Sequence, residues 1–450
     1  MTRRILRLLA VLTALALLAA ACGDSDDTDT SDGGDSGGSE EAGTSDDGGD
    51  LAGESVEIFG AFSGDEADRM RDTLVPLIEA TGIDVTYVDS PAFDTEITTR
   101  VEGGNIPEIA FFPQPGLLLD IADQTGATPV SDYLDLAALE ASLIPGFLDA
   151  ATTDDGTVFG FPVRMAVKSA LWRPLPAFDD AGYAVPATIA ELVALEDQII
   201  SDGGTPWCLG MESGPATGWV GTDWIEELML RLHGPEVYDA WVNHEIVFDS
   251  PEVRAAFEEF EKLWGKDGNV VGGSAGVLGL GFGDSTDDLF TEPANCFLHR
   301  QGNFITGFFP EDVQEDLDSN VAVSYFPPLE GGYEGNPVLA GGDLALLLND
   351  TPAARAVMEF LASDTYGVEW ASAGGWLSPH VGFDASVYPT QVERDLFSIG
   401  ANADVLRFDA SDLMPGPVGT GSFWTGMVDW IGGQRSLDEV LSSIDESWPS

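Results

Sequence analysis

The chain has 450 residues and a formal net charge of −60 at pH 7, because 78 acidic side chains outnumber 18 lysines and arginines. A surface this acidic repels the phosphates of nucleic acids and the headgroups of anionic lipids, which excludes both as partners. About 400 residues follow the N-terminal segments described next, more than one hydrophobic core usually contains, so we expect two lobes.

The N-terminus has the pattern of an export signal. Three arginines within the first seven residues precede an uncharged apolar run, Leu8–Ala21, which is shorter than the roughly 20 residues of a bilayer span. Small residues and then Cys22 follow, as in a bacterial lipobox, although Ala19 stands where leucine is usual. We expect a lipoprotein signal peptide over residues 1–21 and lipid on Cys22; the alternative is an ordinary signal peptide with a coincidental cysteine.

An acidic, low-complexity segment follows the cysteine. From Gly23 to Asp50 the chain contains no aromatic and no basic residue. Such a segment buries too little apolar surface to fold, and its like charges keep it extended. We therefore expect a disordered tether over residues 22–54.

The first folded stretch alternates strands and helices. Ser55–Gly60 (SVEIFG) has the alternation of a half-buried strand, and a long helix is expected next, with Ser63 as its N-cap, Glu66 completing a capping box and Gly82 at its end. A further strand, helix and strand are expected in turn: Ile83–Val88, Asp94–Glu102 and Pro107–Phe112. This order predicts a parallel sheet with right-handed crossovers.

Two segments lie at the carboxyl ends of these strands, where open parallel sheets bind ligands. They are Ala61–Glu66 and Phe112–Gly116 (FPQPG). Asp65 and Gln114 are their candidate ligand-binding residues, although Asp65 also fits a simple first-turn charge on the helix.

Phe161–Leu192 organises the middle of the chain. An extended segment ends at Trp172, a short helix and a Gly–Tyr turn follow, and Thr188 opens a new helix. Arg164 and Lys168 are scarce cations on this extended segment, and each could donate to ligand hydroxyl groups or to a carboxylate across the lobe interface.

Two cysteines remain after the lipobox, Cys208 and Cys296, and in an exported protein they favour one disulfide over two buried thiols. The chain contains no CxxC pair and no Cys/His cluster, so we expect neither a metal nor another cofactor.

Several ordered motifs from Ser55 to the C-terminus resemble one family. They are the Phe161–Leu192 stretch, TPWCLG with the two tryptophans after it, Phe290–Phe304 with its Gly-Asn-Phe loop, Gly341–Ala345 before the helix at Thr351–Leu361, and Gly374–Pro379. Together they resemble the family 1 extracellular solute-binding proteins of bacterial carbohydrate ABC importers, and most of all the α-glucoside-binding members.

The resemblance implies a fold and a division of the chain. The fold is α/β and periplasmic-binding-protein-like, with two α/β lobes joined by hinge crossings and a ligand cleft between them. Lobe 1 is expected to comprise residues 55–162 and 327–375, and lobe 2 residues 163–326 and 376–450, including C-terminal helices.

The resemblance also implies a function. We expect a monomeric, non-enzymatic receptor, held outside the cytoplasm on the cell membrane only by its lipidated N-terminus. It would bind a carbohydrate by hinge closure and deliver it to the permease subunits of an ABC importer.

Sugar recognition requires flat aromatic faces and planar polar groups. Trp219, Trp224, Phe304 and Trp376 are the expected stacking residues, each with a core position as its alternative. Asn303 and Asp343 lie at loop positions of the inferred cleft, and Glu212 and Asp223 are secondary candidates.

Two other functions stay open at this point. A secreted glycoside hydrolase needs only a carboxylate pair, but no acid pair stands out and no GxSxG nucleophile motif is present. A receptor of the same fold for a polyol phosphate would require more cations than Arg164 and Lys168, and one for a polyamine fits the charge but not the resemblance.

Overall fold

The computed structural model describes residues 51–153 and 155–449. The expected signal peptide, Cys22 and the tether as far as residue 50 lie outside the described residues. The described residues belong to one compact unit. Within the described part, no helix combines the length and apolar character needed to cross a bilayer.

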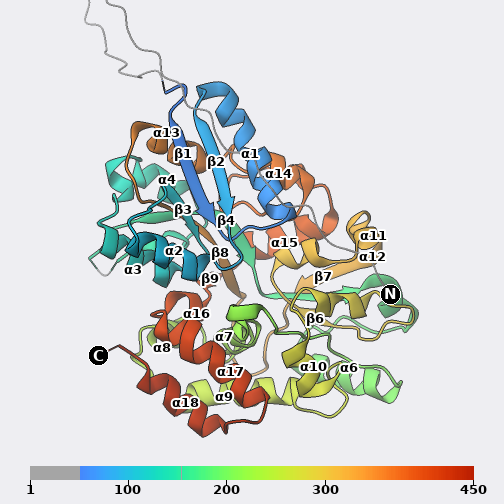
Figure 1. The fold of residues 1–450 in the computed structure, drawn as a ribbon. Helices are drawn as coiled ribbons and strands as arrows, with labels where there is room; N and C mark the ends of the chain where they lie inside the picture. Colours follow the sequence, from blue (N-terminus) through green and yellow to red (C-terminus); the bar gives the residue numbers. More distant parts are fainter. Residues whose placement is uncertain (1–50, 154, 450) are drawn as a thin grey trace, which may run out of the picture. The chain divides into compact units, whose positions relative to one another are not determined.

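The larger of two sheets has six strands in the order β2-β1-β3-β8-β4, with β9 also paired to β8 (Figure 1). The predicted parallel portion is confirmed, because β1 pairs in parallel with both β2 and β3. Strand β8 then runs antiparallel to β3 and β4 and parallel to β9. The strands are β1 (Ser55–Gly60), β2 (Asp84–Asp89), β3 (Ile109–Phe112), β4 (Gly160–Val167), β8 (Pro337–Leu347) and β9 (Val405–Phe408).

Successive residues of this sheet alternate between its two faces, as the pleat requires. Ile58 and Phe111 belong to a core covered by α1 (Asp65–Thr81) and α13 (Pro352–Leu361), whereas Phe59 and Phe112 belong to the opposite core. Helices α2 (Phe93–Glu102) and α3 (Pro115–Thr125) cover that second face.

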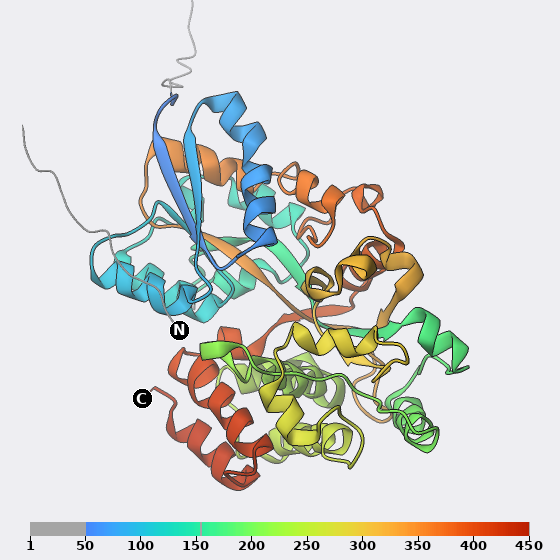
Figure 2. The ribbon, with the colours of Figure 1, turned by 45° about the vertical axis from the view of Figure 1, so that its right-hand side comes forward.

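A separate hydrophobic core is built mainly from helices (Figure 2). Its helices are α6 (Ile189–Ser201), α7 (Trp219–His233), α8 (Pro235–Val242), α9 (Pro251–Trp264), α17 (Trp424–Ile431) and α18 (Leu437–Glu446). The smaller sheet, β6-β5-β7, joins this core to that of the larger sheet, since Leu171 contributes to the helical core and Trp172 to the other. Its strands are β5 (Ala170–Pro174), β6 (His299–Arg300) and β7 (Val321–Tyr325).

The remaining helices have between 4 and 11 residues. They are α4 (Leu136–Ser142), α5 (Leu175–Asp180), α10 (Gly273–Gly279), α11 (Glu311–Gln314), α12 (Leu317–Asn320), α14 (Val368–Ala373), α15 (Gln391–Ala401) and α16 (Ala410–Leu413), together with seven non-α turns, η1 (Val130–Asp132), η2 (Leu148–Ala151), η3 (Gly214–Ala216), η4 (Asp284–Leu289), η5 (Asn303–Phe308), η6 (Ala385–Val387) and η7 (Pro417–Phe423).

Several helices begin at the local sequence signals expected of an N-terminus, as α6 and α9 do, but α1 does not. The hydroxyl of Thr188 accepts a hydrogen bond from the backbone N–H of Glu191, as predicted. The prediction of Ser63 as the N-cap of α1 was wrong: the helix begins at Asp65 after Gly64, without a side-chain cap. Glu66, predicted to complete that capping box, instead accepts a hydrogen bond from Arg164.

The chain passes between the larger sheet and the helical core at three places. They are Lys168–Ser169 after β4, residues 326–336 before β8, and Asp409 after β9. These points differ from the expected lobe boundaries. Residues 163–167 belong to β4, and Trp376 through Leu406 pack in the core of the larger sheet, so the last crossing lies about 30 residues later than the 375/376 boundary expected from Gly374–Pro379.

The expected disulfide joins Cys208 to Cys296, whose Cα atoms lie 5.5 Å apart. Both residues are buried and pack against Leu289 beneath the helical core. The bridge closes a long loop of the chain, with a sequence separation of 88.

Removing this bridge is expected to destabilise the fold. The variant Cys208→Ala/Cys296→Ala should lose about 4 kcal/mol of unfolding free energy in the chain-entropy model, because the unfolded chain regains conformational freedom. Urea unfolding measures the loss, and the wild type unfolded under reducing conditions should match the variant. Equal stability of the oxidised wild type and the variant would refute this.

Candidate functional site

A gap in the pairing of β8 creates the site. Strand β3 pairs with residues 344–347 of β8, and β9 pairs with residues 337–340 on the same edge. Because β3 runs antiparallel and β9 parallel to β8, the carboxyl ends of both strands point toward Gly341–Asp343, which pair with β4 but have no partner on this edge. The segments that follow both strands therefore converge on one place.

A cavity of about 200 Å³ lies at this gap. Its walls come from the larger sheet and from the helical core. They comprise Pro113, Gln114, Arg164, Ala166, Lys168, Ala216, Trp219, Phe304, Gly341, Gly342, Asp343, Asp409, Asp412 and Trp424. Gly342 has to be glycine here, since a Cβ at this position would lie 2.2 Å from the carbonyl oxygen of Arg164.

Arg164 is neutralised within the larger sheet. Its Nε donates to Asp343 Oδ2 at 2.8 Å and its Nη1 to Glu66 Oε1 at 2.6 Å, while the guanidinium lies 4.3 Å from the ring centroid of Phe62. Burial would lower the pKa of Arg164, but Asp343 and Glu66 raise it. The guanidinium is therefore held flat and fully charged at the cavity wall.

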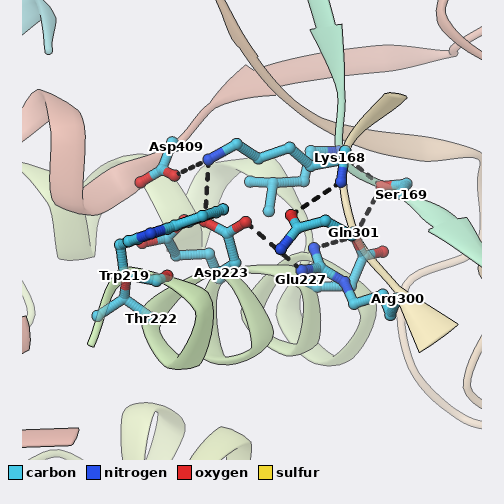
Figure 3. Close-up of polar contacts among 12 residues, drawn as sticks. Lys168, Ser169, Trp219, Thr222, Asp223, Glu227, Arg300, Gln301 and Asp409 are labelled. Carbon is cyan, nitrogen blue, oxygen red and sulfur yellow. Dashed lines mark hydrogen bonds and ion pairs between the residues drawn. The ribbon is translucent and has the colours of Figure 1, made fainter. Parts of the chain in front are cut away.

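Lys168 connects the two parts of the molecule (Figure 3). Its Nζ donates to Asp223 Oδ1 of α7 at 2.9 Å and to Asp409 Oδ2 at the end of β9. The same ammonium lies 5.4 Å from the ring centroid of Trp219. Burial would lower the pKa of Lys168, but the carboxylates raise it well above its usual value.

Some carboxyl groups around Lys168 are ionised and others are protonated. Burial would raise the pKa of Asp409, but the positive charge of Lys168 and the hydrogen bonds with Asp223, Glu226 and Lys168 together lower it. Ser411 Oγ also donates to Asp409 at 2.9 Å. Burial and the negative charge of Asp409 raise the pKa of Glu226 and of Asp412 well above the usual range. Repulsion between nearby carboxylates thus leaves Asp409 charged and keeps Glu226 and Asp412 neutral.

Three of these acids lie close enough to share a metal ion, namely Asp223, Glu226 and Asp409. The ammonium of Lys168 already bonds to two of them. A side-chain cation thus occupies the position in which a metal ion would otherwise balance these charges.

Three aromatic side chains line the same cavity. Trp219 begins α7 and is half-buried, with its ring 6.0 Å from that of Phe304 and 5.3 Å from that of Phe282. Trp424 is buried, and its Nε1 donates to Ser411 Oγ. Gly218 lets these tryptophans approach, because it adopts φ +122° and a Cβ there would lie 2.3 Å from the carbonyl oxygen of Trp424.

The structure brings six of the ten predicted ligand-binding residues to the cavity. They are Gln114, Arg164, Lys168, Trp219, Phe304 and Asp343.

Four predicted residues do not line the cavity. Trp224 lies in the helical core, stacked 5.3 Å from Phe260, and Trp376 is buried against Tyr366 in the core of the larger sheet. Asn303 is buried and accepts from the backbone N–H of Val167, so it fixes the end of β4. Asp65 is exposed in the first turn of α1, which is the alternative that the sequence had left open.

Sequence reasoning missed Asp409, Asp412 and Trp424. The segment 405–412 reads VLRFDASD, a short apolar strand followed at once by polar residues. This is the strand-end signal that identified Gln114, and it could have identified Asp409.

Replacing Lys168 tests the buried charge network. Lys168→Met leaves Asp223 and Asp409 without their cation, and breaking a buried pair in this way costs about 3–5 kcal/mol at neutral pH. Without the ammonium, the folded-state pKa values of these acids rise above the unfolded values. Their protonation therefore restores stability as the pH falls, and the deficit should be smaller at pH 5 than at pH 7.5.

Urea unfolding at both pH values measures this effect. Lys262→Met is the matched control, because Lys262 makes only an exposed pair with Glu259 and should change stability little. A Lys168→Met variant as stable as this control at pH 7.5 would contradict the assigned role.

The chain is similar in sequence to known proteins. Residues 67–368 match the profile of the bacterial extracellular solute-binding proteins. The chain is 44% identical over 401 residues to the osmoprotective compounds-binding protein GgtB of Synechocystis, covering 89% of this chain and 94% of the relative. It is 41% identical over 413 residues to the alpha-glucosides-binding periplasmic protein AglE of Rhizobium meliloti, covering 90% and 89%.

Solved structures are similar in fold. A chitin oligosaccharide binding protein superposes with a TM-score of 0.73 at 17% identity, covering 87% of this chain and 97% of that one. A protein studied for xylan utilization by Caldanaerobius polysaccharolyticus gives 0.72 at 19% identity, covering 87% and 99%. The predicted periplasmic-binding-protein-like α/β fold is thereby confirmed.

Proposed function

Because the chain belongs to the bacterial extracellular solute-binding proteins, we propose that it captures a carbohydrate, an α-glucoside or another oligosaccharide, for an ABC importer. The observation that carries the proposal is the cavity at the β8 gap, where Trp219, Phe304 and Trp424 lie beside ion-paired Arg164 and Lys168. Two relatives, named for binding osmoprotective compounds and alpha-glucosides, support the ligand class.

The chemistry of the cavity favours a neutral polyhydroxylated ligand. Aromatic faces suit the C–H surfaces of sugar rings, and charged groups make strong hydrogen bonds to hydroxyls. Both cations are already neutralised by two carboxylates each. A phosphorylated polyol would therefore find no unpaired positive charge.

The receptor is proposed to act without catalysis. Of the three carboxyl groups lining the cavity, Asp343 and Asp409 are bonded to Arg164 and Lys168. Only Asp412 remains, whereas glycoside hydrolysis uses two carboxyl groups in concert. This arrangement argues against the hydrolase alternative.

Transport would follow from closure of the two parts around the ligand. The larger sheet and the helical core each supply walls of the cavity and are joined by three crossings, so a hinge motion would enclose the sugar. The closed form would then engage a permease. A lipid on Cys22 would hold the receptor at the outer face of the membrane.

Calorimetry with maltose, trehalose, sucrose and methyl α-D-glucopyranoside tests the proposal. We expect one molecule of at least one sugar to bind per chain, and chromatography of the recovered sugar to show no hydrolysis. Released monosaccharide would favour the hydrolase, and failure of every sugar to bind would refute an α-glucoside receptor.

Trp219→Ala is expected to weaken sugar binding about fivefold or more, because it removes a stacking face worth about 1 kcal/mol or more. Trp264→Ala is the control, since Trp264 is also half-buried but does not line the cavity. Calorimetric dissociation constants compare the two. If both variants bind as the wild type does, Trp219 is not part of the site.

Hinge closure predicts a smaller radius of gyration in small-angle X-ray scattering when the bound sugar is present at saturation. Closure requires the ligand to bind the closed form better than the open one. Identical profiles with and without the sugar would refute closure while leaving binding itself intact.

A further inference from the structure

Resting on the function proposed above, we propose that a second cavity beside the first is a subsite for a second sugar unit, so that the ligand class is glycosides of at least two units. This cavity has a volume of about 360 Å³ and shares Gln114 and Asp412 with the first. Its other walls are Asp94, Thr95, Thr98, Thr99, Leu117, Met414, Gly416 and Thr420.

The elements around the second cavity follow from the topology already described. Helix α2 supplies one wall, the start of α3 supplies Gln114 and Leu117, and the segment after β9 supplies the opposite wall. Gln114 and Asp412 stand at the boundary between the two cavities because they follow β3 and β9, whose carboxyl ends face each other across the β8 gap.

Unused acceptors point to a ligand rich in donors. Gln114 is only 8% exposed, and its buried Oε1 accepts no hydrogen bond from any residue that the structure describes. No hydrogen bond or ion pair to the carboxyl groups of Asp94 and Asp412 occurs within residues 51–153 and 155–449. A buried polar atom without a partner is costly, so a ligand that donates to Gln114 Oε1 gains accordingly. The half-buried carboxyl groups of Asp94 and Asp412 are open to the same ligand.

The threonines of the wall also present acceptors. The hydroxyls of Thr98, Thr99 and Thr420 each donate to a backbone carbonyl one turn earlier, at 2.9–3.0 Å. Their lone pairs therefore remain available to ligand hydroxyls. Leu117 and Met414 provide the apolar surface that the C–H groups of a sugar ring require.

Charge restricts the occupant further. No lysine, arginine or histidine lines this cavity, whereas Asp94 and Asp412 do. Burial raises the pKa of Asp94 to about 6, so it is mostly ionised at neutral pH. The Asp94 carboxylate therefore repels phosphate, sulfate and uronate groups and accepts hydrogen bonds from neutral hydroxyls, whereas the neutral Asp412 adds no charge.

Size favours one unit in each cavity. Ligand pockets generally measure about 300–1,000 Å³, so the first cavity alone is small for a ligand site. The first cavity holds the aromatic faces and paired cations, and the second holds the acceptors. A glycoside that bridges Gln114 and Asp412 would use both.

The test compares ligands of one and two units on one variant. Asp94→Asn/Thr98→Val alters only side chains that line the second cavity. Calorimetry compares this variant with the wild type. The dissociation constant of maltose, or of whichever two-unit glycoside of the panel binds, should rise at least tenfold. The dissociation constant of methyl α-D-glucopyranoside should change less than twofold.

Asp68→Asn/Thr81→Val is the matched control on α1, since neither residue lines either of these two cavities. It should bind every sugar as the wild type does, and equal melting temperatures show that both variants fold. If the second-cavity variant weakens both ligands equally, or neither, the second subsite is refuted while the receptor function stands. If no glycoside binds the wild type, the receptor function fails and the subsite fails with it.

Discussion

The structure depends on a buried charged face of helix α7. Asp223 accepts from Lys168 and Glu227 accepts from Ser169, both at the first crossing. Two further groups on this helix face hold the other crossings. Arg231 donates to Tyr325, before the second crossing, and Glu226 accepts from the backbone N–H of Ser411, after the third. One helix thus holds all three connections between the larger sheet and the helical core.

These buried contacts fix the positions of the three crossings more than they stabilise the fold. Asp223, Glu226, Glu227 and Arg231 are at most 1% exposed, and desolvating such groups cancels much of their mutual attraction. Each crossing nevertheless has to lie where its polar group can bond to its partner on α7, because a buried charge without a partner is costly. The docking of Lys168 also sets the position of the ammonium beside Trp219. The first cavity and the crossings therefore depend on the same buried groups of α7.

Local sequence patterns predicted the parallel portion of the sheet and Gln114, because alternation and strand ends are properties of neighbouring residues. They failed where distant partners decide. Glu66 has a capping-box position, yet its partner is Arg164, 98 residues away along the chain. Trp219 and Trp224 lie on one helix in similar sequence, and only packing distinguishes the half-buried ring at the cavity from the core ring. The four-residue strand β9 was not predicted from the local sequence, because it is defined by its pairing with the distant strand β8. Asp409, which follows β9, was missed for the same reason.

The complete internal pairing of the cavity cations has a consequence for the environment in which the protein works. Dissolved salt screens charges on an exposed surface, and a chain with a net charge of −60 is surrounded by counterions. Arg164 and Lys168 are buried with their own carboxylates and are reached by little of that screening. A neutral sugar entering beside them displaces no counterions. Sugar recognition at the proposed site would therefore depend less on the ionic strength of the medium than interactions at the exposed surface do.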